Sequence, residues 1–244
     1  MHTIALIPAR YAATRFPGKL LQMLGDKTII RHTYENTKAT LLFDEVIVVT
    51  DSDLIFDEIT KYGGYAIMSK QEHESGSDRI AEAIADIDVQ IVVNVQGDEP
   101  FVKKEILEGL LNAFNGEKNE SVQVASVMYP INNPEEVNNP NHVKVVIDKD
   151  NNALYFSRSV IPYPRTTTQS IAYYKHIGIY AFKKEALINF TKWPLGSLES
   201  VEKLEQLRYL ENGISIKMVF TNECPIAIDT PEDLEKAKHL LNLV

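Results

Sequence analysis

The sequence predicts an α/β fold with a mostly parallel sheet and an inserted β-rich region in its second half. The first observation is a set of short apolar runs of β-branched residues, which are typical of strands buried on both faces. The second is that stretches with helical spacing of apolar residues separate these runs. The third is that a hairpin pattern and Pro-containing loops replace this alternation in the second half of the chain.

The strands of the first half are expected at 3–8, 45–50 and 90–95, and the helices at 29–40, 53–62 and 77–87. Helical spacing is clear in the last of these, at Ile80, Ala81, Ile84 and Ile87. Strands that alternate with helices form parallel sheets with right-handed crossovers. Such sheets bind ligands beyond the carboxyl ends of their strands. The polar residues that follow each apolar run are therefore the first candidates for a site.

The second half is expected to contain a hairpin, a further strand and two helices. In chain order these are hairpin strands at 143–147 and 153–156, a strand at 177–182, and helices at 199–211 and from 230 onward. The first helix ends at Asn212-Gly213, a common C-cap. The second begins at a capping box opened by Thr230, with Pro231 at the first helical position. No repeat, low-complexity tract or linker divides the chain, and we expect one domain over 1–244.

Composition and charge exclude several classes of function. The 244 residues carry a formal net charge of −9, which argues against a nucleic-acid-binding protein because phosphate backbones demand a basic surface. A few cations gathered in one cleft can still bind a small anionic ligand, because they outweigh the negative average charge locally. The single cysteine, Cys224, fits a reducing compartment. No signal peptide or membrane-spanning run is found, so we expect a cytoplasmic protein without membrane partners.

A cationic loop follows the first strand. The segment 8–21 reads PARYAATRFPGKLL and carries Arg10, Arg15 and Lys19, while Gly18 lets the backbone approach a ligand closely. Three cations at the carboxyl end of a strand indicate an anion-binding loop. It is not a Walker A loop, because the pattern GxxxxGK[ST] is absent. The alternative interpretation is a solvated surface loop whose charges bind nothing specific.

Two aspartates are candidates for a magnesium site. Asp98 follows a glycine at the end of the third strand, and Asp229 stands just before the last capping box. Mg²⁺ usually takes one or two carboxylates and completes its octahedron with phosphate oxygens and water. Thr230 can cap the helix, which leaves Asp229 available to a ligand. The alternative makes Asp98 a turn residue and Asp229 an ordinary acid near a helix start.

Several blocks of the sequence, spread over 8–234, resemble the 3-deoxy-manno-octulosonate (Kdo) cytidylyltransferases. The cationic loop is similar to the PARxxSTRxPGKPL of that family, and VNVQGDEP at 93–100 is a specific match. Further similar blocks are SGSDR at 75–79, ALYFSR at 153–158, YKHIGIYAF at 174–182, EKLEQLR at 202–208 and DTPEDL at 229–234.

The resemblance implies a Rossmann-like nucleotidyltransferase sheet with an inserted β-rich subregion for sugar binding and dimerisation. The nucleotide-binding half would span about 1–128, the sugar-binding half about 129–228, and a closing helix 229–244. The resemblance also implies the activity of the family. This is transfer of CMP from CTP to the anomeric hydroxyl of Kdo, with release of pyrophosphate, for lipopolysaccharide or capsule biosynthesis. The expected partners are CTP and an acidic octulosonate sugar, and a homodimer is expected.

In this family the cationic loop wraps the CTP triphosphate. The implied loop contacts are Ala9, Arg10, Thr14, Arg15 and Lys19. Two positions depart from the family pattern, since Ala13 stands where serine is frequent and Leu20 replaces proline. Neither change removes a charge. The implied catalytic residues are Lys19, Arg10, Asp98 and Asp229, with the two aspartates as ligands of Mg²⁺.

The remaining nucleotide contacts are expected around the third helix and the third strand. Ser75 and Gly76 can offer hydroxyl and backbone groups to the base or ribose, and Arg79 can reach a phosphate or the base. The serine is equally well explained as a helix cap, and capping and binding are compatible. Asn94 and Gln96 flank the metal aspartate and are further expected contacts.

The acceptor site is expected mainly in the second half. The implied sugar-binding residues are Gln96, Arg158, His176, Tyr180, Glu205 and Gln206. A guanidinium such as that of Arg158 pairs with a carboxylate through two hydrogen bonds. The alternatives are a structural role for the lone His176 and a solvated helix face for Glu205 and Gln206. No close pair of histidines suggests zinc.

Two other functions stay open at this point. One is a cytidylyltransferase for another acidic sugar, either 8-amino-Kdo or a nonulosonic acid. Sialate enzymes usually read PARxGSK after the first strand, so this chain is more similar to the Kdo group. The other is an inactive nucleotide-sensing module, against which Lys19, Asp98 and Asp229 all speak. No general base is identified, and a metal-bound hydroxyl of lowered pKa would remove the need for one.

Overall fold

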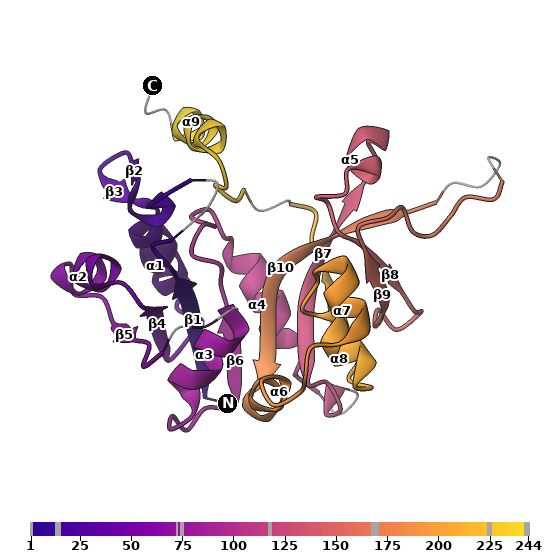
Figure 1. Cartoon of the computed structure of the whole chain (residues 1–244), viewed down its shortest axis with the longest axis horizontal. Coiled ribbons are helices and arrows are strands. Elements are labelled where there is room, and N and C mark those ends of the chain that lie inside the picture. Colours follow the sequence, from indigo (N-terminus) through magenta and orange to yellow (C-terminus); the bar gives the residue numbers. More distant parts are fainter. Residues whose placement is uncertain are drawn as a thin grey trace. The chain divides into compact units, whose positions relative to one another are not determined.

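The computed structural model describes residues 2–12, 16–71, 73, 76–116, 119–166, 171–223 and 226–241. The chain forms two compact units, Met1–Glu108 together with Pro225–Val244, and Gly109–Cys224. The divisions between the expected halves lay near 128 and 228, whereas the structure divides the chain at 108/109 and 224/225. Figure 1 shows the elements of both units in chain colours.

A parallel sheet forms the centre of the first unit. Its strand order is β6 (Ile91–Asn94), β1 (Thr3–Ala9), β4 (Glu45–Thr50) and β5 (Ala66–Met68). All three neighbouring pairs are parallel. The side chains of the two inner strands are almost all inaccessible to solvent, which is why these runs are apolar without alternation. The expected strands of the first half are therefore confirmed within one or two residues of their bounds.

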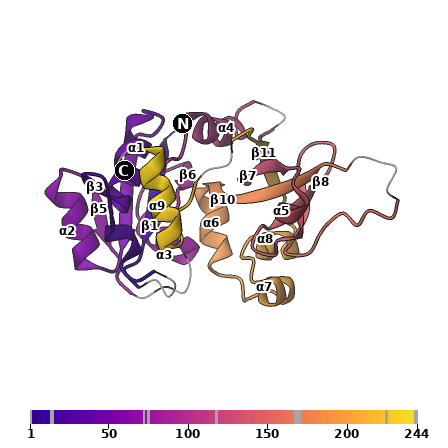
Figure 2. The same cartoon turned by 90° about the horizontal axis from the view of Figure 1, so that it is seen from above.

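Helices connect these strands and pack against the sheet. They are α1 (Ile29–Ala39), α2 (Asp53–Lys61) and α3 (Gly76–Ile84). Helix α9 (Pro231–Leu240), drawn in yellow in Figure 2, also belongs to this unit but follows the second unit in the chain. Thr28 caps α1 by accepting a hydrogen bond from the backbone N–H of Arg31. Thr230 caps α9 in a capping box with Asp233, with proline at the first helical position, as predicted.

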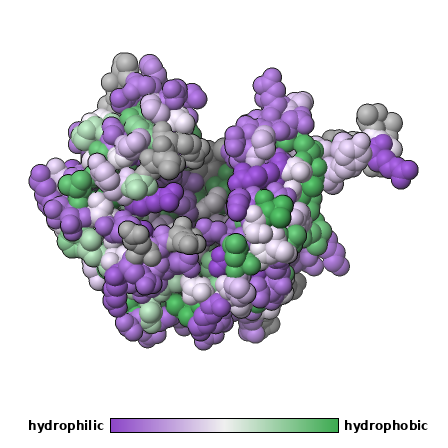
Figure 3. Space-filling model, viewed as in Figure 1, coloured by the Kyte–Doolittle hydropathy of each residue, from purple (hydrophilic) through white to green (hydrophobic). Residues whose placement is uncertain are grey.

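Short elements complete the first unit. They are the 3₁₀ turn η1 (Lys19–Leu21) and the two-residue strands β2 (Met23–Leu24) and β3 (Lys27–Thr28). Helix α4 (Lys104–Asn112) continues across the boundary into the second unit. None of the helices in the described parts of the chain is long and apolar enough to cross a membrane. On the face drawn in Figure 3, hydrophilic residues lie between separate apolar areas.

The second unit is built around β7 (Val124–Ile131). Strand β11 (Ile216–Phe220) runs parallel to it, and β10 (Tyr173–Lys183) pairs with it in antiparallel fashion. The predicted hairpin is confirmed as β8 (Lys144–Ile147) and β9 (Ala153–Ser157), with β8 also pairing with β10. The helices are α5 (Pro134–Asn138), α6 (Lys184–Phe190), α7 (Ser197–Glu202) and α8 (Leu207–Glu211).

The prediction of one continuous helix over 199–211 is wrong. Helix α7 ends at Glu202, Lys203 adopts a left-handed conformation with φ 55°, and α8 starts at Leu207. The break leaves carbonyl groups that a continuous helix would use itself. Arg158 supplies the missing donors, because its Nε and Nη2 donate to the carbonyls of Glu202 and Lys203 at 2.8 and 3.4 Å. The predicted C-terminal end of this helical region is confirmed, because Asn212 is the C-cap of α8 and Gly213 follows with φ 75°.

Candidate functional site

The ammonium group of Lys19 lies between two aspartates in the first unit. Its Nζ is 2.6 Å from Asp98 Oδ2 and 3.0 Å from Asp229 Oδ1. The lysine side chain is 12% exposed, the Asp98 side chain 24% and the Asp229 side chain 43%. Burial alone would lower the pKa of Lys19, yet the two carboxylates outweigh it and the pKa is raised. The lysine is therefore a cation throughout the neutral range.

Backbone geometry brings these three residues together from distant parts of the chain. Gly18 precedes η1 with φ 63°, a left-handed conformation that suits glycine and turns Lys19 back toward the sheet. Gly97 is needed for close approach, because a Cβ there would lie 3.1 Å from the carbonyl oxygen of Pro8. The N–H of Ile228 donates to the carbonyl of Asp98 at 2.9 Å. That bond fixes the segment carrying Asp229 beside the end of β6.

The donor set suits a hard divalent cation that arrives with phosphate. Asp98 and Asp229 already converge on one cationic nitrogen, and Mg²⁺ commonly takes only one or two protein carboxylates. Within the described residues, no group of three His, Cys, Asp or Glu side chains is placed to hold a metal by itself. A closed zinc-type site needs about four protein ligands, so the aspartate pair does not resemble one.

The other predicted nucleotide contacts differ in their exposure to solvent, and some of them lie outside the described residues. Ala9 ends β1 and is buried, whereas Arg10 is exposed. Gly76 opens α3, and Asn94 at the end of β6 is 3% exposed, with its Oδ1 at 3.5 Å from the Gln96 amide nitrogen. The predicted contacts at Thr14, Arg15 and Ser75 lie outside the described residues.

Arg79 is occupied by partners that the sequence did not suggest. Its Nη2 donates to Asp51 Oδ2 at 2.6 Å and its Nη1 to Ser69 Oγ at 3.2 Å, and the residue is 4% exposed. Asp51 and Ser69 follow the ends of β4 and β5, so Arg79 ties α3 to both strands. This arrangement favours a structural role, and contact of Arg79 with nucleotide stays a prediction.

In the second unit, three of the predicted sugar-binding residues form one cluster. The ring of His176 lies 5.3 Å from that of Tyr180, and its Nδ1 is 3.5 Å from the Gln206 amide nitrogen. Burial lowers the pKa of His176 to about 3, so the ring is neutral at physiological pH. Burial, and next the charge of Glu205, raise the pKa of Tyr180 well above its usual value. The sequence therefore identified a set of side chains that meet in space.

Sequence reasoning missed the residue that joins this cluster. Ser126 of β7 is fully buried, and its Oγ lies 2.9 Å from His176 Nε2. No motif marks it, since a small polar residue in an apolar strand has no distinctive spacing. The signal that existed was indirect: a serine with no solvent access needs partners for its hydroxyl.

Arg158 does not present an unoccupied guanidinium to a sugar carboxylate. Besides the carbonyls of Glu202 and Lys203, its Nη1 donates to the carbonyl of Pro140 at 3.1 Å. The Glu202 carboxylate accepts from the Arg158 backbone N–H at 2.9 Å. These bonds favour a role in shaping the loop between α7 and α8, and the predicted carboxylate contact remains untested.

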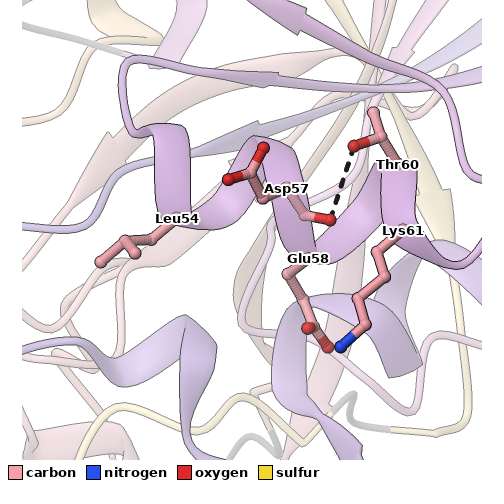
Figure 4. A pocket seen from close by; sticks show the side chains of 5 residues that line it. All are labelled: Leu54, Asp57, Glu58, Thr60 and Lys61. Carbon is pink, nitrogen blue, oxygen red and sulfur yellow. Dashed lines mark hydrogen bonds between the residues drawn. The ribbon is translucent and has the colours of Figure 1, made fainter.

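A hollow of about 580 Å³ lies on the surface along α2, and none of its lining residues was predicted to belong to a site. Its lining side chains are Leu54, Asp57, Glu58, Thr60 and Lys61, all from that one helix (Figure 4). The only bond drawn among them is the ordinary helical contact of the Thr60 hydroxyl with the carbonyl of Asp57. Nothing in this hollow brings side chains from different elements together, which distinguishes it from the Lys19 cluster.

Comparison with known proteins gives a consistent result. A profile described as cytidylyltransferase matches residues 4–216. A 3-deoxy-manno-octulosonate cytidylyltransferase of Flavobacterium johnsoniae is 61% identical over 241 residues, covering 99% of both chains. A protein of the same description from Christiangramia forsetii is 56% identical over 98% of this chain and 96% of its own. A solved structure of CMP:2-keto-3-deoxy-manno-octonic acid synthetase complexed with CTP superposes with a TM-score of 0.94 at 37% identity, covering 100% of this chain and 99% of that one.

Proposed function

The chain belongs to the 3-deoxy-manno-octulosonate cytidylyltransferases, and from this membership we propose that it transfers CMP from CTP to the anomeric hydroxyl of Kdo. Pyrophosphate is the second product. The observation that carries the proposal is the convergence of Lys19 with Asp98 and Asp229 at the end of β6. This arrangement supplies both a cation for phosphate oxygens and carboxylates for a metal ion.

Charge is the main obstacle to the reaction, because the nucleotide and the sugar acid are both anions. In the proposed complex, Lys19 and Arg10 neutralise oxygens of the triphosphate, with Arg15 as a further expected partner. The sugar hydroxyl attacks the α-phosphorus and the bond to the pyrophosphate oxygen breaks. Positioning and electrostatic stabilisation account for most of the rate in such transfers. Residues that hold charge near the phosphates are therefore the ones to test.

Cytidylyltransferases in general use a divalent metal ion. We propose Mg²⁺ here, held by Asp98 and Asp229. When bound, this ion supplies Lewis-acid stabilisation of negative charge on phosphate oxygens. Asp98 is fixed by its own backbone bond to Ile228 and by the tight packing of Gly97, so the carboxylate is positioned before any ligand arrives.

The sugar acid is proposed to bind the second unit. His176, Tyr180, Glu205 and Gln206 offer hydrogen-bonding groups suited to hydroxyls. Gln96 is also expected to contact the sugar. We further propose that the enzyme works as a cytoplasmic homodimer in lipopolysaccharide or capsule biosynthesis. The exposed Leu195 and Val201 of the second unit, 62% and 82% exposed, are compatible with a contact between subunits.

The decisive experiment measures pyrophosphate release by the purified chain with CTP and Mg²⁺. Kdo, 8-amino-Kdo and a sialic acid are compared as acceptors under identical conditions. We expect turnover with Kdo to exceed that with the sialic acid. Release with no acceptor preference, or with the sialic acid alone, would contradict the proposed substrate, and no release with any acceptor would contradict the activity.

A further inference from the structure

Ser126 lies on the same face of the sheet as two predicted sugar-binding side chains. Tyr180 pairs directly with Ser126 across the strands β10 and β7, and His176 pairs with Met128, two residues further along β7. Residues two apart on a strand share a face. A bulge in β10 inserts Gly178 and Ile179 between these pairs and preserves this alignment.

The bulge determines where the Ser126 hydroxyl proton goes. The Ser126 Oγ donates toward the carbonyl oxygens of Ile177 and Ile179, at 3.2 and 3.0 Å. A carbonyl oxygen can only accept, and a serine has one proton to donate. If that proton pointed at His176 instead, the two carbonyl oxygens would face an oxygen with no proton between them. The hydroxyl proton therefore belongs to the carbonyls.

The remaining contact then fixes the tautomer of His176. Its Nε2 lies 2.9 Å from Ser126 Oγ, which has only lone pairs left to offer in that direction. Nε2 must consequently carry the hydrogen and donate it. Because the ring is neutral, Nδ1 is left as an acceptor. The Gln206 amide nitrogen, 3.5 Å from Nδ1, is a donor and agrees with this assignment.

Tyr180 is the cross-strand neighbour of Ser126, and its ring lies 5.3 Å from that of His176. Burial raises the pKa of the Tyr180 phenol, so the phenol stays protonated. The serine hydroxyl donates toward the carbonyl oxygens and accepts from His176, so its single oxygen atom links the bulge of β10 to the imidazole ring.

We propose that Ser126 is a positioning residue, which accepts a hydrogen bond from His176 Nε2 and so holds the ring in the tautomer whose Nδ1 accepts from the Gln206 amide or, in its place, from a ligand hydroxyl. This inference rests on the proposed function for the identity of the ligand, though not for the hydrogen-bond arrangement. An acceptor surface beside Glu205 favours the hydroxyl groups of the sugar acid and repels its carboxylate. The carboxylate must then be bound by residues outside this cluster.

Nitrogen-15 NMR of the imidazole rings, without substrate, tests the arrangement directly. The His176 signals are assigned by their loss in His176→Gln. In the unmodified protein we expect one protonated and one unprotonated nitrogen, with the hydrogen on Nε2. In Ser126→Ala the preference for that tautomer should weaken. Ser157→Ala is the matched control, since Ser157 is also buried in this unit but bonds Glu202, and it should leave the His176 signals unchanged.

Kinetics supply the second measurement. Ser126→Ala should raise the KM for Kdo about tenfold, because the variant loses the hydrogen bond that orients His176. The KM for CTP should stay unchanged. Ser126→Cys keeps the size of the side chain and should behave in the same direction if the alanine variant does not fold. Lack of turnover in the unmodified protein would contradict the proposed function and leave the NMR test intact. A hydrogen on Nδ1 in the unmodified protein, or unchanged His176 signals in both Ser126 variants, would overturn the inference.

Discussion

Lys19 and Asp98 form an ion pair of 2.6 Å between the turn after β1 and the end of β6, and Asp229 joins it at 3.0 Å. One cation thus faces two carboxylates, so the group keeps a net negative charge. Because the pKa of Lys19 is raised, the stabilisation from this pair is complete below about pH 10.5 and is lost only as the pH rises through the higher folded value. The Lys19 ammonium group holds the two carboxylates together, and substitution of each residue separates their contributions.

Asp98→Asn and Asp229→Asn should each abolish most turnover while the fold persists. Each change removes a carboxylate charge from a site proposed to hold Mg²⁺ beside several phosphates. Loss of one such contact should lower kcat by on the order of 10²-fold or more. Pyrophosphate release at saturating Mg²⁺ measures the effect, and circular dichroism checks the fold. Asp57→Asn, an exposed acid on α2, is the control. Near-normal turnover in either site variant would refute the assignment.

Lys19→Met should increase the affinity of the free protein for a divalent cation. In the unmodified protein such an ion must displace the ammonium group from Asp98 and Asp229, and the variant has no such competitor. We expect a gain of about tenfold, equivalent to about 1.4 kcal/mol. Mn²⁺ titration followed by electron paramagnetic resonance, without nucleotide, measures it. Lys27→Met, which removes an ion pair to Glu35, is the matched control. Equal Mn²⁺ affinity in all three proteins would show that Lys19 and the metal do not compete.

The location of the cluster of Lys19, Asp98 and Asp229 was predictable, because it lies beyond the carboxyl ends of parallel strands. Uninterrupted apolar runs identify β1 and β6 as buried parallel strands, and ligands of such sheets lie beyond the carboxyl ends. Asp98 and the cationic loop both stand at those positions. The capping box shows from the local sequence alone that Thr230 is the N-cap of the helix, so Asp229 precedes the helix.

Features that depend on contacts between distant residues were not predictable. The break at Lys203 has no local signal, because lysine is a good helix former and the break relies on donors from Arg158. Contact of Arg79 with nucleotide was predicted from the SGSDR block, and nothing in the sequence pairs this residue with Asp51, 28 residues earlier. Ser126 acquires its partners through a bulge 50 residues away. In each case the decisive interaction is tertiary.

Arg158→Lys separates a direct carboxylate contact from support of the α7–α8 loop. Lysine cannot reproduce the three donations to carbonyl groups, so we expect the free energy of unfolding to fall by about 1–2 kcal/mol. The KM for Kdo should rise in parallel, because the loop carries Glu205 and Gln206, while the KM for CTP stays constant. Arg165, on the same loop, is the competing candidate for the sugar carboxylate, and Arg165→Lys is measured beside it. A raised KM for Kdo with unchanged unfolding would instead indicate that Arg158 binds the sugar carboxylate.

The neutral His176 ring predicts how stability depends on pH. Its pKa is about 3 in the folded chain, below the usual value near 6.5, so the unfolded chain binds more protons between these limits. The contribution of this residue is therefore complete above about pH 6.5 and declines as the pH falls toward 3, by at most about 1.4 kcal/mol per pH unit. His176→Gln removes the titrating group but keeps a polar side chain of similar length. Urea unfolding at several pH values should show a shallower loss of stability in the variant between pH 6.5 and 4, whereas parallel curves would mean that folding does not lower the pKa of His176. The KM for Kdo of the unmodified enzyme should meanwhile show no step near pH 6.5 from this ring, because its Nδ1 remains an acceptor throughout.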